Sequence, residues 1–250
     1  MCFALNRRAE ADTAFPNEAR PITASPPQAV PRVAMLQTWK HLTFLHWPYA
    51  PDLIRPFIPA ALELDTLDGE AWVGLVPFVI HGTPGIPHFP ETNLRTYVIG
   101  PDGSRAVWFF SLDAARLLAV LGARVGYHLP YFWAKMSVRV TDRAIHYRSQ
   151  RHWMHPGDAM TDITIEPAEL YHPSELTDRD HFLTARYRLY TLSRGRLRHA
   201  QIEHAPWPLA RAKLVEMRES LFQRAGLPAP QGAPLVHYAA EISVKIGRLT

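Results

Sequence analysis

The chain has 250 residues, 47% of them hydrophobic, and a formal net charge of +4. One domain of this length buries roughly 70–75% of its extended surface and needs no disulfide or metal to fold, while its thinly spread charge argues against nucleic-acid binding. The lone thiol, Cys2, excludes an internal disulfide, and no apolar run reaches the ~20 residues of a membrane span, so we expect a cytoplasmic protein without a membrane partner.

The first part of the chain separates into a tail and the start of a fold. Residues 1–34 carry five prolines and few large apolar side chains, which predicts a flexible tail. A single domain is expected over residues 35–250. Gln37–Trp47 is predicted to be its first strand, and a short helix is predicted from Pro51 to Phe57, where proline suits a helix start.

The next segment is predicted to be a β-hairpin. Leu62–Leu67 and Ala71–His81 flank an Asp68-Gly69 turn. The second arm shows no polar alternation between Trp72 and Ile80, which predicts that both of its faces are covered. Gly74 and Pro77 within this arm indicate a bend or a bulge.

A row of polar residues is the least expected feature of the sequence. If Phe89–Val98 is a strand, alternate side chains place Glu91, Asn93, Arg95 and Tyr97 on one face. A turn over residues 100–103 should return the chain into the apolar strand Val107–Ser111. The row is either an ordinary solvated face or the lumen of a closed sheet that holds a small ligand.

The remaining elements are also predominantly strands. Helices are expected at Ala114–Val125, N-capped by Asp113, at Asp178–Leu183 and, most clearly, at Pro208–Ala225. Strands are expected to end near Val140 and to cover Ile145–Arg151, Met160–Glu166, Arg186–Leu192, Leu197–His204 and Val236–Ile246. This pattern predicts a mainly β (α+β) domain, a barrel or sandwich with three or four covering helices.

Motifs for metals and nucleotides are missing. His152 and His155, followed by Asp158, form the best local cluster among thirteen histidines, but no HExxH or paired-cysteine signature accompanies them. No GxSxG, P-loop or GxGxxG pattern occurs. We therefore expect neither a metal ion nor a cofactor.

Lys135 is a candidate nucleophile. It is one of four lysines and follows the aromatic segment Tyr131-Phe132-Trp133. Apolar surroundings lower the pKa of a lysine, as an amine that forms a Schiff base requires. The alternative is an ordinary exposed lysine on a strand.

Several segments resemble one protein family. They are His46-Trp47-Pro48, Leu64-Asp65, Asp68 to Phe78, Glu91 to Val98, Trp108 to Asp113, Leu129-Pro130-Tyr131, Tyr147-Arg148-Ser149, Arg186 to Tyr190 and His204 to Trp207. In this order they resemble the YqjF-like family, a domain of unknown function, over roughly residues 36 to 246.

The resemblance implies a fold similar to that of acetoacetate decarboxylase, an antiparallel, cone-like closed β-barrel with a ligand site in its interior. In the decarboxylase relatives, a barrel-lining glutamate and arginine accompany a lysine that forms a Schiff base with a β-keto acid. Glu91 and Arg95 match the first two, and Lys135 lies near the lysine segment, although this chain lacks the paired lysines of that motif.

The resulting hypothesis is a barrel that binds an anionic small molecule, an organic acid or carbonyl compound, in its lumen. An enzyme would use Glu91 as acid or base, Arg95 as the anion-binding group and Lys135 as the amine. The residues expected to shape the pocket are His46, Asn93, Tyr97, Ser111 and Tyr131. A non-catalytic binding or sensing module and a structural barrel with a filled lumen stay open as alternatives, as does a homo-oligomer.

Overall fold

The computed structural model describes residues 18–152 and 159–250 and contains thirteen strands and four α-helices in these ranges. The strands are β1 (Val33–Tyr49), β2 (Glu63–Leu64), β3 (Thr66–Leu67), β4 (Glu70–His81), β5 (Phe89–Ile99), β6 (Arg105–Ala114), β7 (Tyr131–Val140), β8 (Ile145–Arg151), β9 (Met160–Leu170), β10 (Arg188–Ser193), β11 (Arg196–His204), β12 (Leu209–Glu219) and β13 (Leu235–Gly247). The helices are α1 (Pro51–Ile54), α2 (Leu117–Gly126), α3 (Asp178–Thr184) and α4 (Leu221–Arg224), with 3-10 turns at Arg55–Phe57 and Pro173–Glu175.

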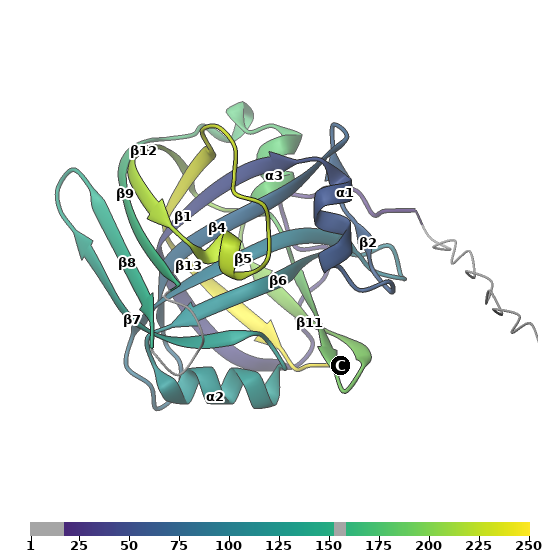
Figure 1. The fold of residues 1–250 in the computed structure, drawn as a ribbon. Helices are drawn as coiled ribbons and strands as arrows, with labels where there is room; N and C mark the ends of the chain where they lie inside the picture. The colour runs from purple at the N-terminus through teal and green to yellow at the C-terminus, as the bar shows by residue number, and fades with distance from the viewer. Residues whose placement is uncertain (1–17, 153–158) are drawn as a thin grey trace, which may run out of the picture.

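All of these strands belong to one sheet that closes on itself (Figure 1). β6 runs parallel to β7 and to β10, and the other strand pairs of the described chain are antiparallel. One closed circuit, which we call the first ring, passes through β13, β1, β4, β5, β6, β10 and β11 and returns to β13. The predicted closed, mainly β fold is thereby confirmed.

A second closed circuit shares most of these strands. β7, β8, β9 and β12 connect β6 to β13, so β1, β4, β5, β6 and β13 belong to both circuits. One face of the shared strands therefore lines the first ring, and the other packs in a second core that includes Leu75, Leu94, Tyr147 and Ile163. Double burial explains why β4 lacks polar alternation, since neighbours such as Leu75 and Val76 face different cores and are both almost fully buried.

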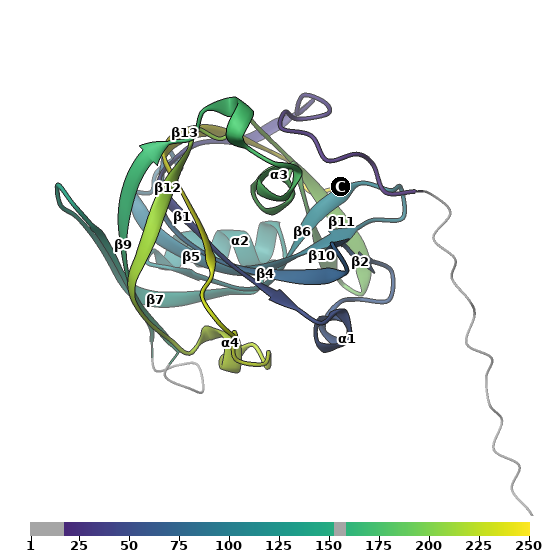
Figure 2. The same cartoon turned by 90° about the horizontal axis from the view of Figure 1, so that it is seen from above.

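Two helices lie at the open ends of the first ring. Figure 1 places α3 at one end and α2 at the other, and Figure 2 looks down the ring past α3 toward α2. α2 begins at Leu117, later than predicted, because Asp113 stays in β6 and does not cap the helix. Its Oδ1 instead accepts a hydrogen bond from Nε of Arg151 at 2.7 Å, which makes the two residues an ion pair. Within the described residues, no helix is long and apolar enough to cross a membrane.

The prediction of a helix over residues 208–225 is wrong. Most of this segment is β12, which pairs with β9 from Ala210 to Glu219, and only the single turn of α4 is helical. Ala, Leu, Lys, Met, Arg and Glu favour helices locally, but pairing with β9 satisfies the backbone and closes the second circuit. Between Leu214 and Glu216 an extra residue in β12 shifts the alternation of side chains, so the apolar residues do not follow a strict period of two.

A bend or a bulge was expected in β4, but the bulge lies in its neighbour β1. The pairing of β1 with β4 shifts between Lys40 and Leu45, where His41 has a positive φ of 52°. Gly74 serves another purpose, because a Cβ on this residue would lie 2.8 Å from Nε2 of His46. The glycine allows the buried imidazole to approach the backbone of β4.

The N-terminal strap, residues 20–30, contacts the barrel although it was expected to be part of a flexible tail. The amide of Arg20 donates to the Gly103 carbonyl at 2.9 Å, and the amide of Val30 donates to Oε2 of Glu203 at 2.6 Å. Between them, the Tyr187 hydroxyl donates to the Ala24 carbonyl. Residues 1–17, with Cys2, and residues 153–158, with His155 and Asp158, lie outside the described chain.

Candidate functional site

The interior of the first ring contains a cavity of about 300 Å³ to which every strand of that ring contributes. Polar residues that line it are Gln37, Thr83, Glu91, Asn93, Arg95, Tyr131, Thr184, Arg186 and His204. Apolar and aromatic residues make up the rest of the wall, among them Trp39, Phe78, Phe89, Leu112, Tyr127, Leu189, Ile202 and Trp207. A mostly apolar cavity with a few converging polar groups is typical of a small-molecule site.

The polar row of β5 points into this cavity. Glu91, Asn93 and Arg95 are alternate residues of one strand, line the cavity and are at most 8% exposed. The intervening Leu94 packs in the second core. Because β5 belongs to both circuits, neither of its faces is solvated, and the solvated reading of the row does not hold.

Glu91 is a buried carboxyl that accepts one side-chain hydrogen bond. The Tyr131 hydroxyl donates to its Oε2 at 2.9 Å. Burial raises the pKa of Glu91 to about 8, an effect that the Tyr131 hydrogen bond opposes and the nearby Asp113 charge reinforces. Burial, together with Glu91, also raises the pKa of Tyr131. Glu91 is therefore largely protonated at neutral pH and able to donate a proton.

Arg95 is a buried guanidinium that forms no ion pair with any described residue. Its Nη2 donates to the Leu183 carbonyl at 3.4 Å, and its Nε has no hydrogen-bond partner in the described chain. The guanidinium carbon lies 5.5 Å from the ring centre of Phe44 and 5.7 Å from that of Tyr97. Buried charges are normally paired, so this cation is available to an anion in the cavity.

Arg186 is a second cavity arginine, and it is paired. Its Nη1 donates to Oδ2 of Asp65 at 2.7 Å, and Arg105 contacts the other oxygen of the same carboxylate. The guanidinium carbon also lies 4.5 Å from the ring centre of Tyr97. Burial lowers the pKa of Arg186, whereas Asp65 opposes the shift. Asp65 thus neutralises part of the positive charge beside Arg95.

His204 lines the same cavity as a neutral base. Burial lowers its pKa to about 4, the Ala205 carbonyl opposes this shift, and the Arg95 charge adds to it. Its Nδ1–H donates to the Ala205 carbonyl at 2.7 Å, and its ring lies 4.5 Å from that of Trp207. Because the imidazole is neutral at pH 7, it adds no charge to the site.

The sequence-based candidates omitted Arg186 and His204. Both residues lie in segments that resemble the YqjF-like family, at Arg186 to Tyr190 and at His204 to Trp207. That resemblance was the one feature of the sequence that could have pointed to these two residues. Nothing in their local pattern shows that β10, β11 and β5 face one cavity.

Tyr97 and His46 lie beside the cavity and do not line it. The Tyr97 hydroxyl donates to the Leu183 carbonyl at 2.5 Å and lies 2.6 Å from Nε2 of His46. Since the phenol has one proton, Nε2 of His46 is the donor in the second contact. Burial and the Arg95 charge lower the pKa of His46, so the ring is neutral. Both residues therefore support the wall around Arg95, and Tyr97 also binds α3 through the Leu183 carbonyl.

Two of the expected site residues lie elsewhere. Lys135 is exposed on β7 and does not line the cavity, so the alternative of an ordinary exposed strand lysine holds and the hypothesis of an apolar environment for its amine does not. Ser111 is buried but does not line the cavity. A bulge in β6, opposite Leu94 and Arg95, turns Ser111 to the other face of the strand. Phe109 and Leu112 are the residues of this segment that line the cavity. Its hydroxyl has no hydrogen-bond partner within the described chain.

None of the four lysines lines the cavity, and all four lie in the described ranges. Lys40 and Lys245 form ion pairs with Glu241 and Glu203, and Lys213 is exposed like Lys135. The described residues also contain no group of three His, Cys, Asp or Glu side chains placed to hold a metal ion. The chemistry that these side chains can supply is acid–base transfer and anion binding.

Sequence comparison shows the family of this chain. Residues 36–243 match the family DUF2071, described as "Uncharacterized conserved protein (COG2071)". The "Uncharacterized protein YqjF" of Bacillus subtilis (strain 168) is 39% identical over 218 residues, which cover 84% of this chain and 89% of that protein. The chain therefore belongs to the DUF2071 family.

Solved structures with the same fold include acetoacetate decarboxylase of Legionella pneumophila, with a TM-score of 0.60. The two sequences are 12% identical, and the match covers 99% of this chain and 98% of the decarboxylase chain. The enduracididine biosynthesis enzyme MppR, in complex with pyruvate, has a TM-score of 0.60 and 13% identity over 93% and 98% of the two chains. The fold is thus that of the acetoacetate decarboxylase-like proteins.

Proposed function

We propose that this member of the DUF2071 family binds a small carboxylic acid in the cavity of the first ring and catalyses proton transfer on it with Glu91. The observation that carries the proposal is the unpaired Arg95, a permanent cation in the same enclosed space as a carboxyl with a raised pKa. Titratable groups with perturbed pKa values in a cavity are typical of functional sites.

Arg95 would bind the carboxylate of the ligand. A guanidinium matches a carboxylate with two parallel N–H donors, and its burial strengthens the contact relative to water. Asn93, whose side-chain oxygen has no hydrogen-bond partner in the described chain, offers a further polar group between Arg95 and Glu91. The apolar wall around Trp39 and Phe78 accommodates the carbon skeleton.

Glu91 would exchange a proton with the ligand. In its protonated form it donates a hydrogen bond to a carbonyl oxygen, and in its ionised form it removes a proton from the carbon beside that carbonyl. A pKa of about 8 places both forms within reach of physiological pH. The acetoacetate decarboxylase and pyruvate-bound relatives of the same fold suggest oxo acids as the first ligands to test.

The proposed chemistry differs from Schiff-base catalysis. An imine requires an amine in the cavity, and all four lysines lie outside it. Borohydride treatment with a panel of 2-oxo and 3-oxo acids should therefore leave no adduct on any lysine. Lys135→Ala should behave like the unmodified protein in every assay.

Binding is tested by calorimetric titration with pyruvate, acetoacetate and longer oxo acids. Arg95→Gln should weaken the bound acid at least tenfold, whereas Arg139→Gln, a change of an exposed arginine on β7, should leave the affinity unchanged. Equal affinity in the Arg95→Gln protein would exclude the assignment of Arg95.

Catalysis is tested by NMR in D2O, which detects exchange of the protons beside the carbonyl for deuterium. Exchange should require Glu91 and disappear in Glu91→Gln with binding retained. Saturable binding without exchange or any product would instead identify a non-catalytic binding or sensing module. That alternative is favoured because no lysine lines the cavity, and it would bind its ligand through the same residues, Glu91, Asn93 and Arg95.

A further inference from the structure

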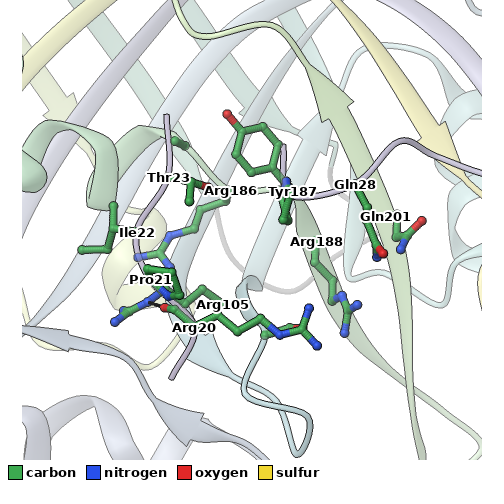
Figure 3. Close-up of a pocket in the computed structure, with 13 residues that line it drawn as sticks. Arg20, Pro21, Ile22, Thr23, Gln28, Arg105, Arg186, Tyr187, Arg188 and Gln201 are labelled. Atoms are coloured by element: carbon green, nitrogen blue, oxygen red, sulfur yellow. Dashed lines mark hydrogen bonds between the residues drawn. The ribbon is translucent and has the colours of Figure 1, made fainter. Parts of the chain in front are cut away.

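A second pocket lies outside the lumen, between the N-terminal strap and the ends of β6, β10 and β11 (Figure 3). Its volume is about 130 Å³. Four arginines line it, Arg20, Arg105, Arg186 and Arg188, and no acidic residue does. The remaining polar residues of its wall are Thr23, Gln28, Ser104, Tyr187 and Gln201.

The four guanidinium groups form two triads, each with one carboxylate. Arg105 and Arg186 share Asp65, with Arg186 at 2.7 Å. Arg20 and Arg188 share Asp102, at 3.4 and 2.8 Å. Each triad has one positive charge more than it has negative charges, so the wall of the pocket carries a net charge of about +2 at neutral pH.

The carboxylates leave several arginine donors unused. The side-chain hydrogen bonds of Arg188 to described residues all start from Nη1, and those of Arg20 all start from Nη2. Nη2 of Arg186 is buried without a hydrogen-bond partner in the same ranges. Asp102 remains ionised, because Ser104 and Arg188 hold its pKa below the ordinary value despite partial burial. The triad of Arg20, Arg188 and Asp102 therefore keeps one excess positive charge at neutral pH.

The strap completes the pocket. Nε of Arg105 donates to the Arg20 carbonyl at 2.7 Å, and the hydroxyl of Tyr187 donates to the Ala24 carbonyl. Pro21, Ile22 and Pro27 of the strap line the pocket with Ala185. The arginines thus line a small pocket in which Arg186 and Arg188 are buried, and this burial strengthens their interaction with an anion relative to open solvent.

We propose that this pocket binds a phosphate dianion, either free or as the terminal group of a phosphomonoester. Two triads with one excess charge each match a dianion, and a tetrahedral phosphate can accept hydrogen bonds from the guanidinium groups of both triads. The pocket shares Arg186 with the wall of the lumen but contains neither Glu91 nor Arg95, so the proposal does not depend on the function proposed for those two residues.

The test is calorimetric titration with inorganic phosphate at constant ionic strength, with sodium chloride as the reference. Saturable binding is expected, and Arg20→Gln and Arg188→Gln should each weaken it at least tenfold. Arg20 is exposed, so its substitution leaves the fold intact even if Arg188→Gln does not. Arg139→Gln, outside the pocket, and Arg95→Met, in the lumen, should bind phosphate as the unmodified protein does.

The same titration with glycerol 3-phosphate distinguishes a phosphomonoester from free phosphate, and tighter binding of either one supports the proposal. Malonate carries the same charge on two separate planar carboxylates and should bind more weakly. The proposal is overturned if phosphate shows no saturable binding, if Arg20→Gln and Arg188→Gln leave the affinity unchanged, if Arg95→Met abolishes it, or if malonate binds as tightly as phosphate.

Discussion

The hydroxyl of Tyr131 lies 2.9 Å from Oε2 of Glu91 and donates a hydrogen bond to it across the end of the first ring. The two residues come from β7 and β5, which are both neighbours of β6. This contact is the hydrogen bond that opposes the effect of burial on the Glu91 carboxyl. It links the proton affinity of the candidate catalytic group to one side chain that can be changed.

Glu91 should make the stability of the protein depend on pH. Its pKa is about 8 in the folded protein against an ordinary value of 4.5, so the folded state binds more protons between these values. The resulting stabilisation is fully present below about pH 4.5 and is lost as the pH rises through about 8. The free energy of unfolding of the unmodified protein, compared with that of the Glu91→Gln protein, should therefore fall by up to about 1.4 kcal/mol for each unit of pH between the two pKa values. Urea denaturation of both proteins at several pH values measures the difference, and a constant difference would contradict the raised pKa.

Tyr131→Phe should raise the pKa of Glu91 further. The substitution removes the donor that stabilises the ionised carboxylate and leaves burial in place. A 13C NMR titration of labelled glutamate side chains, assigned with Glu91→Gln, measures this pKa. Tyr127→Phe is the matched control, because Tyr127 also lines the cavity but donates to the Gly247 carbonyl. An unchanged or lower pKa in Tyr131→Phe would show that the hydrogen bond does not act as described.

Arg95→Met and Arg186→Met should change stability in opposite directions. Arg95 has no ion-pair partner in the described chain, so its replacement removes an uncompensated buried charge and should stabilise the ligand-free protein by about 1–3 kcal/mol. Arg186→Met leaves the buried Asp65 with one partner fewer and should destabilise by about 3–5 kcal/mol. Thermal and urea unfolding measure both effects. Equal destabilisation by the two substitutions would indicate that Arg95 is structural.

Gly74→Ala should destabilise the fold by about 1–3 kcal/mol through overpacking. The added Cβ would lie 2.8 Å from Nε2 of His46, a fully buried ring that also contacts Tyr97. Gly122→Ala in α2 is the control, since nothing lies within 4 Å of its added Cβ. That substitution should stabilise by about 0.5–1 kcal/mol, as alanine does within helices. Urea denaturation compares the two, and a neutral Gly74→Ala would mean that the ring of His46 moves freely.

Local patterns predicted much of the fold because most of its strands are hairpin neighbours. The hairpin of β5 and β6 follows from a turn near Gly103 between two β-type segments. β12 was mistaken for a helix because the residues of β9 that pair with it lie 40 to 58 positions earlier in the chain, and pairing over that distance leaves no local signal. The order in which the strands close the ring is likewise a property of distant contacts.

The candidate site shows the same division. The sequence alone determined that Glu91, Asn93 and Arg95 share one strand face, since side chains alternate along any β-strand. Only the tertiary structure decided that this face is enclosed, that Arg186 and His204 join it, and that Lys135 and Ser111 do not. The physical reason is that alternation follows from backbone geometry within a few residues, whereas burial depends on which distant strands cover the face.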